Sequence, residues 1–197
     1  RMRLIRKAVW KAAGACKDIT AAHLQAVADL LEKQTGRYVK LPYGLTATRV
    51  YNVIEIMGKR KETEKICLPI DTDRLPENLL AGEWKFSFKK FLYDGNTDKI
   101  PRKMYTKWFD YDKIKDSLAI RNRRKGDYFV LDAAGHHKKL EDYFVNEKIP
   151  ASHRDEQLLL AGEDEIFWIV GGRMAYGTGI SDATRWVLEI TASNSSH

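Results

Sequence analysis

Apolar residues near the N-terminus recur at three- and four-residue spacing, and this period predicts two amphipathic helices. The first apolar stripe runs through residues 2–12, with Arg and Lys mostly off the stripe, and the second runs through residues 19–31. Asp18 is a suitable N-cap for the second helix. Gly36 is a suitable end, because glycine accepts the left-handed conformation that follows many helices. The pattern therefore predicts an N-terminal helical hairpin.

Beyond residue 36 the period shortens to two, which is typical of β-strands. The clearest alternation covers residues 83–93, where Trp84, Phe86 and Phe88 point to one side and Lys85 and Lys89 to the other. Other strands are predicted at residues 38–41, 48–56, 66–70, 118–121, 158–160, 166–170 and 186–190. A helix is predicted to begin at Lys138 and Lys139 and to stop before Pro150, and a second short helix is predicted over residues 152–157.

Helices and strands do not alternate regularly, so the expected class is α+β and not a βαβ repeat. Residues 94–107 read as a loop, because they combine Gly95, Asn96 and Pro101 with four bases. We therefore predict a helical region with short strands over residues 1–105 and a mixed α+β domain over residues 106–192. The polar residues 193–197 are predicted to be a disordered tail.

The 197-residue chain is 44% hydrophobic, which excludes disordered and fibrous classes. Its net charge of +7 is unevenly placed, since residues 1–159 carry 32 bases against 22 acids. This surplus indicates a polyanionic partner. No apolar run is long enough for a membrane helix, no signal peptide is visible, and two cysteines cannot form a disulfide framework, so we expect a cytoplasmic protein. The chain begins without an initiator methionine, and we expect a fragment of a longer protein.

The candidate catalytic and metal-binding patterns are weak. His136 and His137 are adjacent and cannot readily chelate one ion, and no Gly-x-Ser-x-Gly nucleophile motif or phosphate-binding glycine loop occurs. Asp127, Asp132, Asp142 and Glu147 have no spacing that favours an acid–base pair over ordinary surface acids. The sequence therefore predicts no catalytic, cofactor or metal residues in this chain.

Basic clusters give the stronger signal. Residues 121–125 contain four bases in five positions, and Lys138 and Lys139 form a second cluster near Tyr128, His136 and His137. Arg and Lys can hold a phosphate backbone while aromatic side chains stack on bases. The residues alone thus predict an RNA- or DNA-binding α+β module.

An ordered series of short motifs resembles one family. The motifs are Arg-x-Gly-Asp at 124–127, Lys-Lys-Leu-x-Asp-x-Phe at 138–144, Lys-Ile-Pro at 148–150, Arg-Asp at 154–155 and Trp-x-Val-Gly at 168–171. Together they resemble the C-terminal region of bacterial tRNA(Ile)-lysidine synthetase. Residues 17–19, His23, residues 41–44 and Tyr51 are similar to the helical substrate-binding region of the same family.

The resemblance implies an ATP-dependent ligase that attaches lysine to the wobble cytidine of tRNA(Ile). In this family the chemistry, with ATP and Mg, belongs to an N-terminal catalytic domain with a Ser-Gly-Gly-x-Asp-Ser loop, which this sequence lacks. The chain would then hold the tRNA body and acceptor stem and be inactive alone. Its last domain would resemble a module of phenylalanyl-tRNA synthetase.

The tRNA contacts are predicted from the basic motif positions and their neighbours in the same turn. They are Arg121, Arg123, Arg124, Lys125, Lys138, Lys139 and Arg154. The alternative for each is a structural salt bridge, above all for Arg154 beside Asp155. The alternative for the whole chain is an interaction domain that docks to the catalytic N-terminal domain or forms a homodimer.

Overall fold

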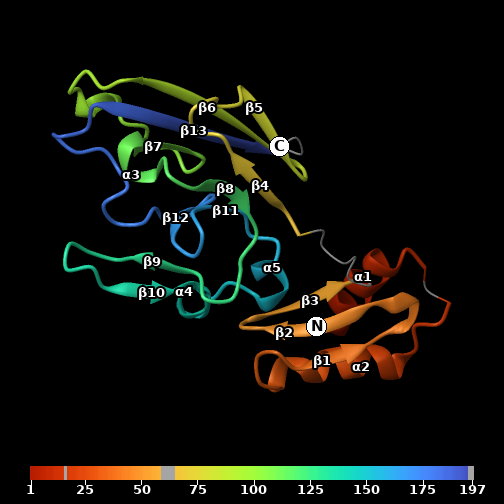
Figure 1. The fold of residues 1–197 in the computed structure, drawn as a ribbon. Coiled ribbons are helices and arrows are strands. Elements are labelled where there is room, and N and C mark those ends of the chain that lie inside the picture. Colours follow the sequence, from red (N-terminus) through yellow and green to blue (C-terminus); the bar gives the residue numbers. More distant parts are fainter. Residues whose placement is uncertain (16, 59–64, 195–197) are drawn as a thin grey trace. The chain divides into compact units, whose positions relative to one another are not determined.

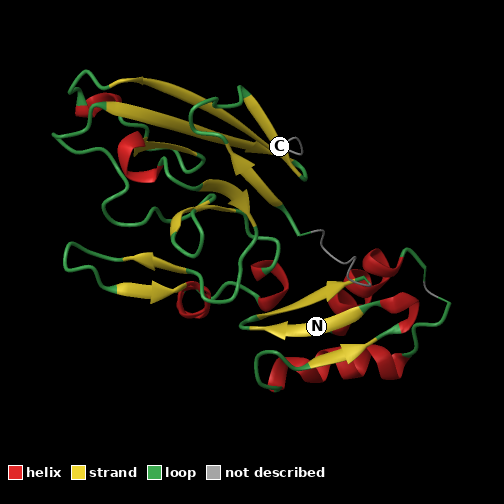
Figure 2. Cartoon of the chain, in the orientation of Figure 1, coloured by secondary structure: helices red, strands yellow, loops and turns green. Residues whose placement is uncertain are grey.

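The computed structural model describes residues 1–15, 17–58 and 65–194. The chain divides into two compact units, Arg1–Thr63 and Glu64–His197, and each is described by itself (Figure 1). Both units combine helices with antiparallel strands (Figure 2), which confirms the predicted α+β class.

The first unit packs two helices and a three-stranded sheet around one core. Its elements are α1 (Met2–Ala13), α2 (Ala21–Asp29), the short 3-10 helices η1 (Leu30–Glu32) and η2 (Pro42–Gly44), β1 (Tyr38–Lys40), β2 (Thr46–Val50) and β3 (Val53–Met57). The sheet order is β1-β2-β3, all antiparallel. Val9 of α1, Val27 of α2 and Ala47 of β2 are almost fully buried in the core.

Two local predictions in this unit are wrong. The N-cap of α2 is Thr20, not Asp18: the His23 N–H donates to Thr20 Oγ1, and the Thr20 N–H donates to His23 Nδ1 at 3.1 Å. Asp18 instead accepts a hydrogen bond from the Tyr43 hydroxyl at 2.9 Å. The strand predicted over residues 48–56 is a hairpin, because the chain reverses at Tyr51, whose φ is 47°.

The second unit contains two four-stranded sheets and an outer layer. The elements of the unit are β4 (Cys67–Ile70), β5 (Asn78–Ala81), β6 (Trp84–Leu92), η3 (Thr97–Lys99), β7 (Thr106–Asp110), α3 (Tyr111–Ile114), β8 (Leu118–Arg121), β9 (Tyr128–Val130), β10 (His137–Lys139), α4 (Leu140–Asn146), α5 (Ala151–Arg154), β11 (Leu159–Ala161), β12 (Ile166–Ile169) and β13 (Trp186–Asn194). The sheet orders are β5-β6-β13-β7 and β12-β11-β8-β4, and β9 pairs with β10.

These elements form three layers with a core in each gap. Phe86 and Ile190 of the first sheet pack on Ile120 and Leu160 of the second. On the other face of the second sheet, Leu159 packs with Phe129 of β9 and residues of α4. The three layers follow one another from top to bottom of this unit in Figure 1. The layers place the end of β8 and the turn that follows it beside the outer layer.

The predicted boundary near residue 105 lies inside the second unit. β6 pairs along its whole length with β13, from Trp84 opposite Asn194 to Leu92 opposite Trp186. β4 likewise pairs with β8. Residues 64–105 therefore belong to the same unit as the last third of the chain. Ser193 and Asn194, predicted to be in the tail, end β13, and residues 195–197 lie outside the described residues.

Gly171 follows β12 with a φ of 75°, where a side chain would be strained and crowded. A Cβ at this position would lie 2.6 Å from Cε1 of Tyr105. Gly135 has a similar φ of 78° but no atom within 4 Å of such a Cβ, so Gly135→Ala is a matched control. Both changes incur the left-handed cost of about 1–2 kcal/mol. We expect Gly171→Ala to lose roughly 1 kcal/mol more in urea denaturation; equal losses would show that Tyr105 moves aside freely.

Candidate nucleic-acid interface

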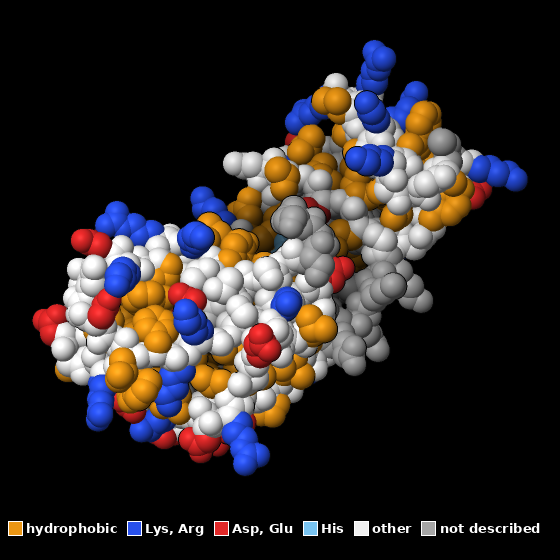
Figure 3. Space-filling view, turned by 90° about the horizontal axis from the view of Figure 1, so that it is seen from above, with side chains coloured by type: hydrophobic (Ala, Val, Ile, Leu, Met, Phe, Trp, Pro, Cys, Tyr) orange, Lys and Arg blue, Asp and Glu red, His pale blue; other side chains and the backbone are white. Residues whose placement is uncertain are grey.

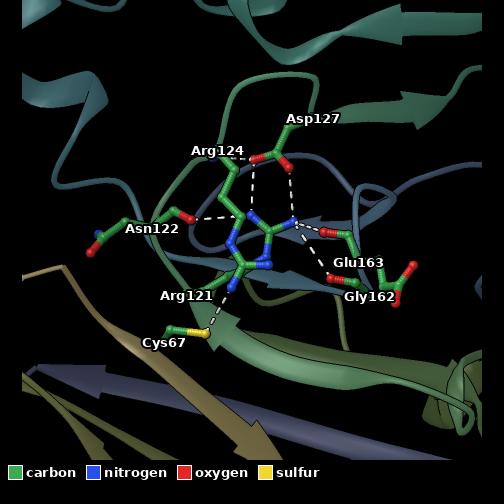
Figure 4. Close-up of polar contacts among 7 residues, drawn as sticks. All are labelled: Cys67, Arg121, Asn122, Arg124, Asp127, Gly162 and Glu163. Carbon is green, nitrogen blue, oxygen red and sulfur yellow. Dashed lines mark hydrogen bonds and ion pairs between the residues drawn. The ribbon is translucent and has the colours of Figure 1, made fainter.

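A buried ion pair closes the basic turn after β8. Arg121, the last residue of β8, is 1% exposed. Its Nη1 donates to Asp127 Oδ2 at 2.9 Å, and its Nη2 donates to Asp127 Oδ1 at 2.8 Å (Figure 4). Nη2 also donates to the Glu163 carbonyl at 2.8 Å. The two ends of the turn are thus joined by a bidentate charged contact, which is both strong and geometrically specific.

Two further contacts fix the backbone inside the turn. Asp127 Oδ2 accepts the Arg124 backbone N–H at 2.7 Å. Asn122 is bound to Ile66 in both directions: its N–H donates to the Ile66 carbonyl at 3.0 Å, and its Oδ1 accepts the Ile66 N–H at 2.7 Å. The turn is therefore anchored to the segment that leads into β4, and its backbone is held independently of any ligand.

Arg121 was predicted to contact RNA, and its burial corrects that prediction. A guanidinium that is 1% exposed and paired with Asp127 does not present its donors to a partner on the surface. Its role is to hold the turn that carries Arg123, Arg124 and Lys125. The structure thus separates the basic cluster into one buried structural residue and three residues that lie at the surface.

The turn borders a cavity of about 480 Å³. Four cationic residues line it: Lys65, Arg123, Arg124 and Lys125. Two acidic residues, Glu141 and Asp155, line it as well, so bases outnumber acids in its wall. Cys67 is the first residue of β4 and Lys65 precedes that strand. Both lie more than 50 residues before the turn, and nothing in the sequence pattern singles them out as site residues.

The arginines in the cavity wall are positioned differently. Arg124 is exposed, and its Nη2 lies 3.0 Å from Cys67 Sγ (Figure 4). Arg123 is half-buried, and its Nη2 lies 2.6 Å and its Nε 2.8 Å from Asp155 Oδ1. Lys65 and Lys125 are exposed. The cavity therefore offers three exposed cations and one that is already engaged by a carboxylate.

Lys138 and Lys139 end a strand, so the prediction that they begin a helix is wrong. They belong to β10, which pairs with β9, and α4 begins at Leu140. Successive strand residues face opposite sides, and Lys139 is exposed whereas Lys138 is half-buried. Neither lines the cavity. The turn between β9 and β10 is closed at Asp132, whose Oδ1 accepts the Ala134 N–H at 3.0 Å.

Arg154 lies in α5, where its Nε donates to the Ile149 carbonyl at 2.9 Å. Its neighbour Asp155, the expected salt-bridge partner, forms an ion pair with Arg123. Arg154 is half-buried and does not line the cavity. The structure thus brings Arg123, Arg124 and Lys125 together and leaves Arg154 and the two lysines of β10 apart from them.

Comparison with known proteins finds a family match for the segment that contains the basic turn. Residues 118–190 match the family described as the TilS substrate C-terminal domain. The chain therefore contains a TilS C-terminal domain. A crystal structure of a TilS C-terminal domain shares the fold, with a TM-score of 0.50 and 19% identity over 67% of this chain and 98% of that one.

Two relatives of this chain share one name, tRNA(Ile)-lysidine synthase. It is 32% identical over 191 residues to a tRNA(Ile)-lysidine synthase of Caldanaerobacter subterraneus subsp. tengcongensis, covering 96% of this chain and 40% of that protein. It is 29% identical over 197 residues to a tRNA(Ile)-lysidine synthase of Clostridium perfringens, covering 96% of this chain and 42% of that protein. The chain thus spans about two fifths of the length of these relatives.

The TilS C-terminal domain supplies most of the cavity wall, and the segment before it supplies the rest. The turn, Glu141 and Asp155 lie within residues 118–190, whereas Lys65 and Cys67 precede them. On the face seen in Figure 3, Lys and Arg side chains alternate with hydrophobic and acidic ones. Surface charge alone therefore does not mark an interface there, and the clustering of cations around one cavity is the more specific feature.

The histidines of the β9–β10 hairpin serve local contacts. His136 Nδ1 lies 2.9 Å from Asp132 Oδ2, and this hydrogen bond lowers the pKa of the Asp132 carboxyl. The His137 ring meets the Tyr128 ring edge-on, with centroids 4.8 Å apart.

Within residues 1–15, 17–58 and 65–194, no three His, Cys, Asp or Glu residues are grouped so as to hold a metal ion. In the same residues, no helix is long and apolar enough to span a membrane.

Proposed function

We propose that this chain is the tRNA-binding part of a tRNA(Ile)-lysidine synthase, and that the cavity beside the basic turn receives the RNA backbone. The observation that carries the proposal is the fixed turn. A buried ion pair holds a backbone that presents two exposed cations, Arg124 and Lys125, and the half-buried Arg123, which is paired with Asp155. Guanidinium and ammonium groups are the usual protein partners of phosphate. The names of the relatives supply the identity of the RNA, tRNA(Ile).

Preorganisation strengthens this interpretation. A loop that must be ordered on binding loses conformational entropy, which reduces affinity. Here the Arg124 N–H and the Asn122 side chain are already bound to Asp127 and Ile66. The cations can therefore engage phosphate without that cost to the backbone. Lys139, exposed on β10, is a further candidate for a phosphate contact on the same RNA.

We assign the attachment of lysine to the part of the relatives' length that this chain does not cover. The sequence lacks the Ser-Gly-Gly-x-Asp-Ser loop that, by the resemblance, carries the chemistry in this family. We assign ATP and Mg to a catalytic N-terminal domain, and to this chain the body and acceptor stem of tRNA(Ile). We further propose, without using it as support, that the last domain resembles a module of phenylalanyl-tRNA synthetase.

The test is the salt dependence of binding between the chain and a tRNA(Ile) transcript. Each phosphate neutralised by a protein cation makes the slope of log affinity against log salt more negative by roughly 0.7 to 0.9. With three to four cations at the cavity, we expect a slope of about −2 to −4 in a filter-binding assay. Undetectable or salt-independent binding would contradict the proposal.

An apolar groove in the first unit favours one alternative, docking to a catalytic domain or to a second copy. The groove, of about 290 Å³, is lined by residues of α1 and β3, among them Leu4 and Val53, which are 73% and 56% exposed. Light scattering on the same samples separates the two functions. A stable dimer that tRNA neither binds nor dissociates would favour docking, whereas a monomer that binds tRNA favours the proposed function.

A further inference from the structure

The cavity wall contains more than a phosphate site requires. Two carboxylates, Glu141 and Asp155, share it with Lys65, Arg124 and the other cations. A carboxylate repels a phosphate, so a site for phosphate alone would gain nothing from either of them. A ribonucleotide differs from a simple anion because it carries ribose hydroxyls, which can donate hydrogen bonds to a carboxylate.

The two carboxylates are not equivalent. Asp155 is engaged, because Arg123 donates to it through two nitrogen atoms at 2.6 and 2.8 Å. Glu141 lies in the first turn of α4 and is exposed. In the part of the chain that the structure describes, its carboxylate has no hydrogen bond or ion pair. Glu141 is therefore the acceptor that a ligand in the cavity would meet.

The volume of the cavity also suits a nucleotide. Its 480 Å³ lies within the range of about 300–1,000 Å³ that is typical of small-molecule pockets. A single phosphate would fill a small part of that space. Ile66 and Cys67 add apolar surface next to the cations, which a sugar or base can cover.

We propose that the cavity is a subsite for one ribonucleotide of the bound RNA, with the phosphate on Lys65, Arg124 and Lys125 and a ribose hydroxyl donating to Glu141. This inference rests on the proposed function. The 2′-hydroxyl distinguishes RNA from DNA at a given protein site. Glu141 thus selects RNA: it accepts the hydroxyl of a ribonucleotide and repels the phosphate of a deoxyribonucleotide that offers no hydroxyl in return.

The experiment compares Glu141→Gln with the unchanged chain on two probes, a tRNA(Ile) transcript and an all-deoxy strand of the same sequence. We expect the variant to bind the transcript about five- to tenfold more weakly, because a neutral amide oxygen accepts a weaker hydrogen bond than a carboxylate does. The same variant should bind the deoxy strand equally well or more tightly, because a repulsive charge is removed. Glu147→Gln, an exposed glutamate at the end of α4 that does not line the cavity, removes the same charge and should leave the RNA-to-DNA ratio unchanged.

The outcomes separate the inference from the function on which it rests. If Glu141→Gln shifts RNA and DNA binding in parallel, as a purely electrostatic carboxylate would, the ribonucleotide subsite is wrong while tRNA binding stands. If the unchanged chain binds no tRNA, the proposed function itself fails. Weaker binding of the transcript with equal or tighter binding of the deoxy strand, absent in Glu147→Gln, supports the subsite.

Discussion

Replacing Asp127 with alanine is expected to lower the free energy of unfolding of the larger unit by about 3–5 kcal/mol, because it leaves a buried guanidinium without its counterion. The side chains of Arg121 and Asp127 are 1% and 0% exposed, so water cannot replace the lost carboxylate. The change also removes the acceptor of the Arg124 N–H and releases the basic turn. Urea denaturation followed by tryptophan fluorescence measures the effect, since Trp168 is fully buried in this unit.

The matched control is Asp155→Ala, which breaks the ion pair with Arg123. Those side chains are 32% and 43% exposed, and pairs at the surface contribute at most about 1 kcal/mol. A double variant, Arg121→Met with Asp127→Leu, should recover part of the stability lost in Asp127→Ala, since no unpaired charge remains in the interior. Losses of equal size for Asp127→Ala and Asp155→Ala would show that the buried pair does not hold the turn.

Local periodicity predicted the strands better than their partners. The alternation of Trp84, Phe86 and Phe88 predicts a strand, and the structure confirms it as β6. The same alternation does not reveal that β6 pairs with β13, about 100 residues later in the chain. A domain boundary depends on such distant pairings. The loop of glycine, proline and bases at residues 94–107 therefore predicts a division near residue 105, whereas the structure divides the chain at residues 63/64.

The candidate site shows the same limit in chemical terms. The density of basic residues indicates the turn at residues 121–125. Charge alone does not reveal burial, so it does not distinguish Arg121 from Arg124. One other signal in the sequence does: Asp127 lies close enough along the chain to pair with an arginine at the start of the turn. Asn122 and Lys65 gave no comparable signal, since their roles depend on the approach of β4 to the end of β8.

The double variant Arg124→Ala with Lys125→Ala is expected to bind tRNA(Ile) about 10- to 30-fold more weakly at about 0.15 M salt. Two phosphate contacts contribute roughly 1.4 to 1.8 to the salt slope, and their effect on affinity vanishes as salt approaches about 1 M. The variant should therefore show both a weaker affinity and a shallower slope. Folding should be intact, because Asp127 holds Arg124 through its backbone N–H, which alanine retains, and Lys125 is exposed.

A control of equal charge makes the result specific to the turn. Lys85 and Lys89 are exposed on β6, in the other four-stranded sheet, and replacing both with alanine removes the same net charge from the same unit. If tRNA binding depended on overall charge alone, the two double variants would lose affinity equally and their salt slopes would match. Arg121, Asn122 and Asp127 fix the turn, and its cations converge on one cavity. We therefore expect the salt slope to become shallower in the Arg124→Ala and Lys125→Ala double variant and to change little in the control.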